Sequence, residues 1–216
     1  MRKDVIEAIK KEKLVVIVRG VAKDKLIPMA EAMYEGGIRL LEITYSANGA
    51  VSDEETAESI AMLKKHFGER MMIGAGTVLT CRQVDLTKEA GGEFIISPNT
   101  NGEVIDYTRR QDLVSLPGAF TPSEVQAAYE YGADFVKLFP ITELGISYVK
   151  AIRAPLSHIP MLAVGGIDLT NMKDYLEAGV DGFGIGSNLV NKKMIEANDW
   201  KGIAALAEEY VRAAKG

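Results

Sequence analysis

The sequence predicts an α/β protein in which strands and helices alternate. Eight short apolar runs each precede a longer amphipathic stretch. Continuous apolar strands between amphipathic helices are typical of a parallel sheet covered by helices. Eight such units within 216 residues favour a closed (β/α)8 barrel, the TIM barrel, over an open doubly wound sheet. No linker or low-complexity segment interrupts the pattern, so we expect one barrel domain over residues 1–216.

The expected strands are short runs dominated by apolar and often β-branched residues, which suits strands buried on both faces. The first of them, residues 14–19, consists mainly of valine and isoleucine. In chain order the strands are expected over residues 14–19, 38–44, 71–74, 93–97, 113–116, 134–139, 160–164 and 182–185.

The expected helices lie between these strands, and an amphipathic charged helix precedes the first strand. They cover residues 24–36, 53–67, 82–90, 102–110, 122–131, 146–154 and 169–178, with a further helix over 200–214. Glycines such as Gly91 and Gly179 supply the left-handed residue at which a helix stops. Thr121, Pro122 and Glu124 predict an N-cap, a first helical residue and a capping-box partner.

Composition narrows the functional classes. The net charge of −5 argues against a general affinity for nucleic acid or anionic membranes. No apolar stretch reaches the roughly 18 residues of a membrane span, and the N-terminus lacks the apolar core of a signal peptide. The one cysteine, Cys81, is expected at a helix start and suits a reducing cytoplasm, the expected location. His66 and His158 are isolated, so no metal site is expected.

Lys137 stands near the end of the apolar run 134–139. Burial disfavours the charged ammonium and lowers its pKa, and a neutral amine can attack a ketone to form a Schiff base. The alternative is a strand-end lysine whose tip reaches solvent. Because active residues of these barrels gather at the C-terminal ends of the strands, we expect the amine at the barrel mouth.

Glu42 lies between Leu41 and Ile43 near the end of the second expected strand. A carboxylate in a semi-apolar pocket has a raised pKa and can move protons in both directions, as Schiff-base chemistry requires. The alternative is an ion pair with Lys137. Phe120, after the fifth expected strand, could form a wall of the same pocket.

Glycine motifs end three further strands. In residues 74–77 the glycines would let the backbone approach a ligand, and Thr77 could donate a hydrogen bond to a carboxylate; a tight turn is the alternative. Gly165-Gly166 and Gly186-Ser187 follow the seventh and eighth strands, where barrels often bind phosphate. Ser187 could add a hydroxyl and open the next helix.

Together these motifs resemble the family of 2-keto-3-deoxy-6-phosphogluconate aldolases, which includes 4-hydroxy-2-oxoglutarate aldolases. The resemblance covers nearly the whole chain. In order, it comprises Ile17-Val18-Arg19-Gly20, Glu42, Gly74-Ala75-Gly76-Thr77-Val78-Leu79, Ile96-Ser97-Pro98, Pro117-Gly118, Thr121-Pro122-Ser123-Glu124, Lys137-Leu138-Phe139-Pro140, Gly165-Gly166-Ile167 and Gly186-Ser187. It implies a class I aldolase of the Entner-Doudoroff pathway, without metal or cofactor and usually a homotrimer. Such an enzyme cleaves a phosphorylated 2-keto-3-deoxy sugar acid into pyruvate and glyceraldehyde 3-phosphate.

The resemblance also implies a role for each candidate residue. Lys137 would form the imine with the C2 ketone, and Glu42 would be the general acid/base. Thr77 resembles a contact to the pyruvate carboxylate. The remaining substrate-binding residues would be Arg19, Pro98, Phe139 and Val164, and the phosphate-binding residues Gly165, Gly166, Gly186 and Ser187.

Two positions depart from the gluconate-type pattern. Ser46 replaces an arginine near the pyruvate carboxylate, for which Arg19 is the candidate substitute. Ala163-Val164 replaces Pro-Thr, so a threonine hydroxyl is lost. Val164 and Asn99 resemble the 2-keto-3-deoxy-6-phosphogalactonate aldolases, whose substrate differs in configuration at C4. A single hydroxyl contact can decide such a preference. The phosphogluconate compound is expected first, with the galactonate epimer and 4-hydroxy-2-oxoglutarate as alternatives.

Two other functional classes stay open. A phosphate-binding barrel isomerase or decarboxylase would need a second acid/base group or a metal near the mouth, and the sequence offers no clear histidine or Asp-x-Lys pair for it. A non-catalytic phospho-sugar binding protein would bind its ligand without turnover.

Overall fold

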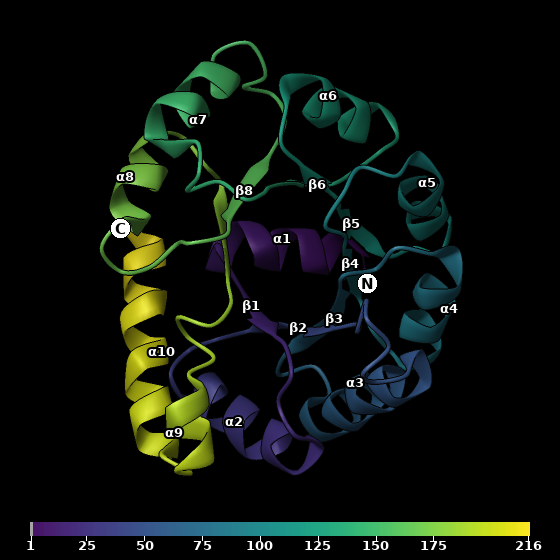
Figure 1. Cartoon of the computed structure of the whole chain (residues 1–216), viewed down its shortest axis with the longest axis vertical. Helices are drawn as coiled ribbons and strands as arrows, with labels where there is room; N and C mark the ends of the chain where they lie inside the picture. Colours follow the sequence, from purple (N-terminus) through teal and green to yellow (C-terminus); the bar gives the residue numbers. More distant parts are fainter. Residues whose placement is uncertain (1) are drawn as a thin grey trace.

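The computed structural model describes residues 2–216 and shows a ring of parallel strands surrounded by helices (Figure 1). The strands are β1 (Leu14–Val18), β2 (Leu40–Thr44), β3 (Met72–Gly76), β4 (Phe94–Ile96), β5 (Val114–Leu116), β6 (Gly118–Ala119), β7 (Val136–Leu138), β8 (Met161–Val164) and β9 (Gly182–Ile185). The helices are α1 (Arg2–Glu12), α2 (Lys23–Glu35), α3 (Asp53–Phe67), α4 (Cys81–Glu89), α5 (Gly102–Arg110), α6 (Pro122–Glu130), α7 (Gly145–Arg153), α8 (Met172–Glu177), α9 (Lys192–Glu196) and α10 (Trp200–Lys215).

The sheet confirms the predicted barrel, with one difference in its strand count. Over residues 2–216 the nine strands follow the order β5-β4-β3-β2-β1-β9-β8-β7-β6. The fifth expected strand, 113–116, corresponds to β5, and the additional strand is β6, which follows directly after Pro117. Proline has no N–H to donate to a ladder, and it separates β5, which pairs with β4, from β6, which pairs with β7. The carbonyl oxygen of Pro117 accepts from the backbone N–H of Lys137 at 2.9 Å, so β5 and β6 together close the ring.

Most expected helices lie within a residue or two of their predicted bounds, and α4 begins at Cys81 as expected. The capping box of Thr121 and Glu124 at the start of α6 is also confirmed. The largest error concerns α8, which begins three residues later than predicted. The Asp168 side chain accepts from the backbone N–H of Thr170 at 2.8 Å, and this local turn delays the helix.

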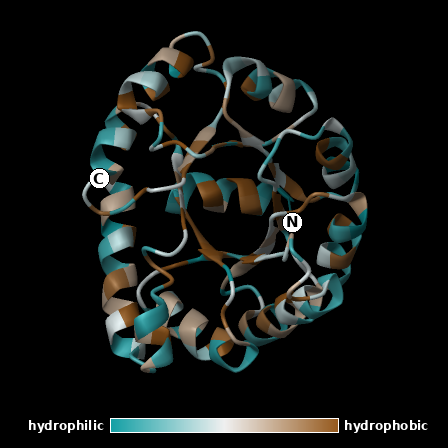
Figure 2. Ribbon diagram, in the orientation of Figure 1, coloured by the Kyte–Doolittle hydropathy of each residue, from teal (hydrophilic) through white to brown (hydrophobic). Residues whose placement is uncertain are grey.

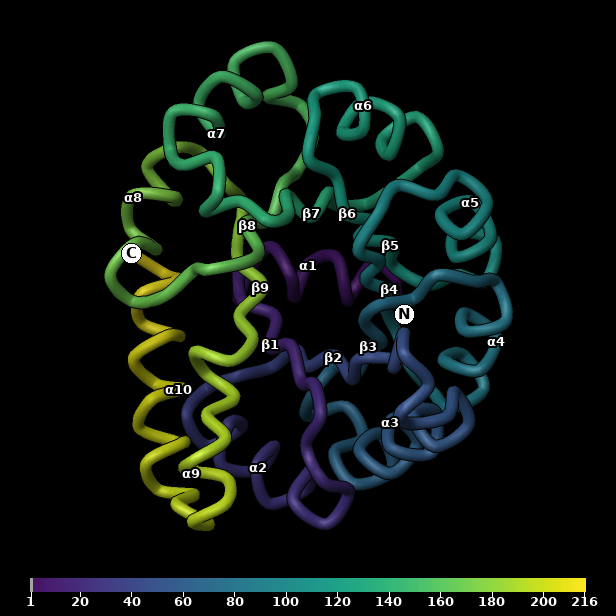
Figure 3. Tube along the Cα trace, viewed as in Figure 1, coloured from purple at the N-terminus to yellow at the C-terminus, as the bar shows by residue number. Residues whose placement is uncertain are grey.

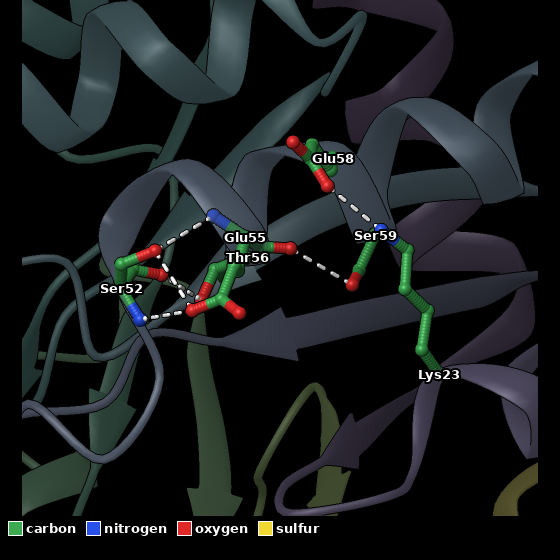
Figure 4. Close-up of polar contacts among 6 residues, drawn as sticks. All are labelled: Lys23, Ser52, Glu55, Thr56, Glu58 and Ser59. Atoms are coloured by element: carbon green, nitrogen blue, oxygen red, sulfur yellow. Dashed lines mark hydrogen bonds and ion pairs between the residues drawn. The ribbon is translucent and has the colours of Figure 1, made fainter.

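The helix after the Glu42 strand has a well-defined start, shown in Figure 4. The Ser52 hydroxyl accepts from the Glu55 N–H at 3.1 Å, and the Glu55 carboxylate accepts from the Ser52 N–H at 2.9 Å, forming a capping box. Lys23 donates to Glu58 at 2.7 Å and so joins α2 to α3. These contacts fix the two helices that flank β2.

The inside of the barrel is apolar and is closed at one end by α1, which crosses the ring in projection (Figure 3). Val5 and Ile9 of α1 are fully buried and pack against inward-facing strand residues. Lys10 shares a hollow with Phe135, Pro160 and Asp181, which directly precede β7, β8 and β9. Helix α1 therefore lies at the N-terminal ends of the strands, and the opposite end forms the mouth.

A second apolar layer lies between the strands and the outer helices, as the colouring in Figure 2 shows. Helix α10 packs against α2 so closely that a Cβ on Gly36 would lie 2.4 Å from the carbonyl oxygen of Ala204. Within residues 2–216, none of the helices has the length and apolar character needed to cross a membrane.

Candidate active site

A cavity of about 270 Å³ occupies the barrel mouth. Apart from Glu42, every predicted site residue contributes to its wall: Arg19, Thr77, Pro98, Lys137, Phe139, Val164, Gly165, Gly166, Gly186 and Ser187. The strands and their following turns bring together residues that are up to 168 positions apart, between Arg19 and Ser187. Four further wall residues, Ile17, Ile167, Gly184 and Asn188, were given no role at the site by the sequence.

Lys137 lies on β7 with only 9% of its surface exposed. Its Nζ is 4.7 Å from the centroid of the Phe139 ring. Burial is the main cause that lowers the pKa of Lys137; Arg19 lowers it further, whereas Glu42 opposes the shift. The side chain is therefore buried rather than solvent-exposed, and a larger fraction of the amine is neutral than for an ordinary lysine.

Glu42 lies on β2 and is 1% exposed. Burial raises the pKa of Glu42 to about 7, although the charge of Lys137 and a hydrogen bond from Thr44 act in the opposite direction. The Thr44 hydroxyl donates to Oε1 at 3.2 Å, while Oε2 has no hydrogen-bond partner among residues 2–216. A carboxyl group with this pKa can take up and release protons near neutrality.

Gly76 makes room for the Glu42 carboxylate. A Cβ at position 76 would lie 1.8 Å from Oε1 of Glu42, and a Cβ at Gly74 would lie 2.4 Å from the Phe94 ring. Both glycines belong to β3 rather than to a turn. The expectation that they clear space for a ligand is therefore corrected: neighbouring side chains fill the space.

Arg19 and Thr77 meet across the mouth, where the Arg19 guanidinium donates to the Thr77 hydroxyl at 2.9 Å. Thr77 has a φ of +55°, a left-handed conformation that is rare for a β-branched residue and costs about 1–3 kcal/mol. This conformation directly follows β3 and places the hydroxyl beside Arg19. The pair combines a permanent cation with a hydroxyl at one side of the cavity.

The two glycine-containing loops form a further part of the cavity wall. Gly165 and Gly166 both have positive φ, +96° and +75°. The Asn188 side chain donates to the carbonyl oxygen of Ile167 at 2.8 Å and joins the two loops. Ser187 lies in a turn, and the next helix begins at Lys192, so the prediction that Ser187 opens a helix is wrong. The N–H group of Leu189 binds back to the carbonyl oxygen of Gly186 at 3.0 Å, which forms this turn.

Phe120 and Ser46 lie outside the wall of the cavity that contains Lys137. Phe120 does not contribute to the cavity wall; it is 38% exposed and packs near Tyr148, with ring centroids 6.2 Å apart. Ser46 lines an adjoining hollow of about 420 Å³, which also contains Arg19. Its hydroxyl donates to the Asn48 side chain at 2.7 Å. Position 46 therefore contributes no cation to the mouth.

No group of three or more His, Cys, Asp or Glu side chains within residues 2–216 is arranged to hold a metal ion. The site instead brings together the buried amine of Lys137 and the carboxyl group of Glu42, whose pKa is about 7. The cation Arg19 and the two glycine-containing loops complete it. Such a set can attack a carbonyl group, transfer protons and bind anionic groups.

Comparison with known proteins supplies independent information. The family model described as "KDPG and KHG aldolase" matches residues 5–206. The 2-dehydro-3-deoxy-phosphogluconate aldolase of Haemophilus influenzae is 31% identical over 209 residues, 96% of this chain and 95% of the relative. The 2-dehydro-3-deoxy-6-phosphogalactonate aldolase of Escherichia coli is 34% identical over 177 residues, 82% of this chain and 83% of the relative.

A solved structure agrees with these sequence matches. The KDPG aldolase of Legionella pneumophila, with pyruvate captured as a covalent carbinolamine intermediate, superposes with a TM-score of 0.85 at 27% identity. The match covers 97% of this chain and 98% of that structure.

Proposed function

Because the chain belongs to the KDPG and KHG aldolase family, we propose that it cleaves a phosphorylated 2-keto-3-deoxy sugar acid through a Schiff base on Lys137. The protein is an aldolase, a carbon–carbon lyase. The observation that carries the finer proposal is the buried Lys137 amine at the barrel mouth, within electrostatic reach of Glu42. The products are pyruvate and glyceraldehyde 3-phosphate.

The reaction begins when the neutral Lys137 amine attacks C2 of the ketone. A carbinolamine forms and loses water, which leaves a protonated imine between Nζ and C2. The lowered pKa of Lys137 supplies the nucleophile, because the neutral amine carries the lone pair that attacks. Glu42 protonates the departing hydroxyl, which its raised pKa permits near neutrality.

Cleavage of the C3–C4 bond follows. Glu42, now ionised, accepts the proton of the C4 hydroxyl, so C4 becomes the aldehyde carbon. The electron pair of the broken bond moves into the C2–C3 bond, and the protonated imine becomes a neutral enamine. Glu42 returns its proton to C3, which restores the protonated imine. Water then attacks C2 while Glu42 accepts a proton from it, and the C2–Nζ bond of the resulting carbinolamine breaks to release pyruvate and the Lys137 amine.

The two anionic ends of the substrate have separate candidate contacts. Thr77 and Arg19 bind the carboxylate of the pyruvate half, on the side of the cavity where they meet. Pro98 and Phe139 form apolar walls beside Lys137. The phosphate binds at the two glycine-containing loops, where the residues are Gly165, Gly166, Gly186 and Ser187.

We propose 2-keto-3-deoxy-6-phosphogluconate as the preferred substrate. 4-Hydroxy-2-oxoglutarate, a substrate of other aldolases of this family, is an alternative. One observation favours the galactonate epimer as the second candidate: Val164 lines the cavity without a hydroxyl. The choice is tested by a lactate-dehydrogenase-coupled assay of pyruvate release from the two C4 epimers side by side. Faster pyruvate release from the galactonate epimer would make that epimer the preferred substrate.

The Schiff base is tested by incubation with pyruvate and borohydride. We expect a stable pyruvate-derived mass on the peptide that contains Lys137, and no such mass in Lys137→Met. The exposed Lys150 provides a matched control, since Lys150→Met should be trapped like the wild type. No adduct on Lys137 would refute the mechanism. Metal-dependent activity that survives Lys137→Met would favour an isomerase or decarboxylase. Binding of the sugar acid without turnover would favour a non-catalytic phospho-sugar binding protein.

Assembly as a homotrimer in the cytoplasm completes the proposal. The homotrimer is what the resemblance to the family implies. Light scattering coupled to gel filtration would test the trimer by giving three times the chain mass.

A further inference from the structure

A second hollow, of about 360 Å³, adjoins the cavity that contains Lys137. The two spaces share Ile17, Arg19, Gly186 and Ser187. The remaining wall of the second hollow consists of Gly20, Val190 and Lys192. The Gly186–Ser187 turn therefore lines both the Lys137 cavity and the hollow that contains Lys192.

The charges around this hollow are all positive. Arg19 and Lys192 line it, and no carboxylate belongs to its described wall. None of the ion pairs within 4.0 Å formed by residues 2–216 includes Lys192, although Glu196 lies one helical turn further along. Arg19 donates to a neutral hydroxyl, that of Thr77. In a chain with a net charge of −5, this hollow is a local site for an anion.

The position of Lys192 is fixed by the local structure. It is the first residue of α9, and the Asn191 side chain caps this helix by accepting from the Met194 N–H at 3.2 Å. A lysine ammonium is a compact point charge, which suits an anionic group approached from one side. A tetrahedral phosphate held by the glycine-containing loops would leave oxygen atoms directed towards the hollow.

We propose that Lys192 binds the phosphate of the substrate from the outer side of the Gly186–Ser187 turn. Its positive charge makes the enzyme prefer phosphorylated over unphosphorylated substrates. This inference rests on the proposed function, because it assigns the loops to the phosphate end of a keto-deoxy sugar acid.

The test compares Lys192→Gln with Lys193→Gln, a matched variant of the next residue, which is exposed and lies outside the hollow. We measure kcat/KM for the phosphorylated and unphosphorylated forms of one keto-deoxy sugar acid. The ratio of the two values should fall about fivefold in Lys192→Gln, as expected for one partly exposed ion pair, and stay unchanged in Lys193→Gln. Lys192→Arg should restore the ratio. An unchanged ratio in Lys192→Gln, or an equal fall in Lys193→Gln, would overturn the inference.

A binding experiment separates this inference from the proposed function. In calorimetric titrations with inorganic phosphate, Lys192→Gln should bind about fivefold more weakly than the wild type, and Lys193→Gln equally tightly. If the wild type cleaves neither sugar acid, the proposed function fails while this titration still decides the role of Lys192. Equal binding by Lys192→Gln, or no binding by the wild type, refutes that role.

Discussion

The Glu42 carboxylate occupies the place where residue 76 would carry a side chain. A Cβ at Gly76 would lie 1.8 Å from Oε1 and 2.7 Å from Oε2 of Glu42. The two residues lie on neighbouring parallel strands, β2 and β3, where Glu42 is in register with Gly74 and Gly76 is in register with Thr44. The catalytic proposal for Glu42 therefore depends on a glycine in another strand.

Gly76→Ala should displace the Glu42 carboxylate and reduce activity. We expect kcat/KM to fall roughly a hundredfold, the scale of a misplaced general acid/base. The measurement is the coupled assay of pyruvate release, with circular dichroism to verify that the variant is folded.

The Glu42→Ala background provides the control for this prediction. With the carboxylate absent, the added methyl group has space, so Gly76→Ala should cost little further activity in the double variant. Losses that multiply in the double variant would mean that the alanine acts through the backbone rather than through Glu42.

The pH dependence of stability should reveal the buried carboxyl group. The pKa of Glu42 is raised from 4.5 to about 7, so between these values the folded chain holds a proton that the unfolded chain has released. The corresponding stability is fully present below pH 4.5 and is lost as the pH rises through about 7.

Chemical denaturation of the wild type and of Glu42→Gln between pH 4.5 and about 7 measures how much the protonation of Glu42 contributes to the unfolding free energy. Relative to the variant, which cannot titrate, the wild type should lose about 3 kcal/mol of unfolding free energy over the range. Parallel pH profiles for the two proteins would show that Glu42 titrates normally.

The Thr44 hydroxyl should tune the proton affinity of Glu42, because it donates to Oε1 at 3.2 Å and favours the ionised form. Thr44→Val removes the donor with little change in shape. The limb of the pH–rate profile that belongs to Glu42 should move up by about 0.7 units, as expected from a hydrogen bond of about 1 kcal/mol. Thr44→Ser should restore the wild-type profile, and a profile unchanged in Thr44→Val would exclude this role.

Val164 should influence which C4 epimer reacts faster, since it lines the cavity beside the glycine-containing loops. Val164→Thr supplies a hydroxyl at nearly constant volume. We expect the ratio of kcat/KM for the gluconate over the galactonate epimer to rise about tenfold, as expected for one hydrogen bond of about 1.4 kcal/mol. Val164→Ala, which changes volume without adding a hydroxyl, is the control; a similar shift in that variant would assign the preference to size.

The sequence was sufficient to predict the barrel and most of the mouth. Alternating apolar and amphipathic runs predict parallel strands and covering helices, and the position of Lys137 near a strand end places it at the mouth. These inferences succeed because parallel strands of one barrel all end at the same side. The cavity wall therefore contains residues from distant parts of the chain, such as Arg19 and Ser187.

The errors concern features that depend on contacts distant in sequence. The space at Gly76 is filled by a side chain from 34 positions earlier, Glu42, which no local pattern indicates. The additional strand β6 after Pro117 forms because it pairs with β7, whereas β5 pairs with β4. Phe120 faces Tyr148 rather than the mouth, because its direction is set by packing against α7.

Helix α1 closes one end of the barrel. Its buried Val5 and Ile9 fill the base, so within the described residues 2–216 solvent and ligands reach Lys137 from the mouth. If the pyruvate half is bonded to Lys137, the phosphorylated fragment lies between it and the entrance. The products then leave in a fixed sequence, the aldehyde before pyruvate, and product-inhibition kinetics should follow an ordered uni-bi pattern.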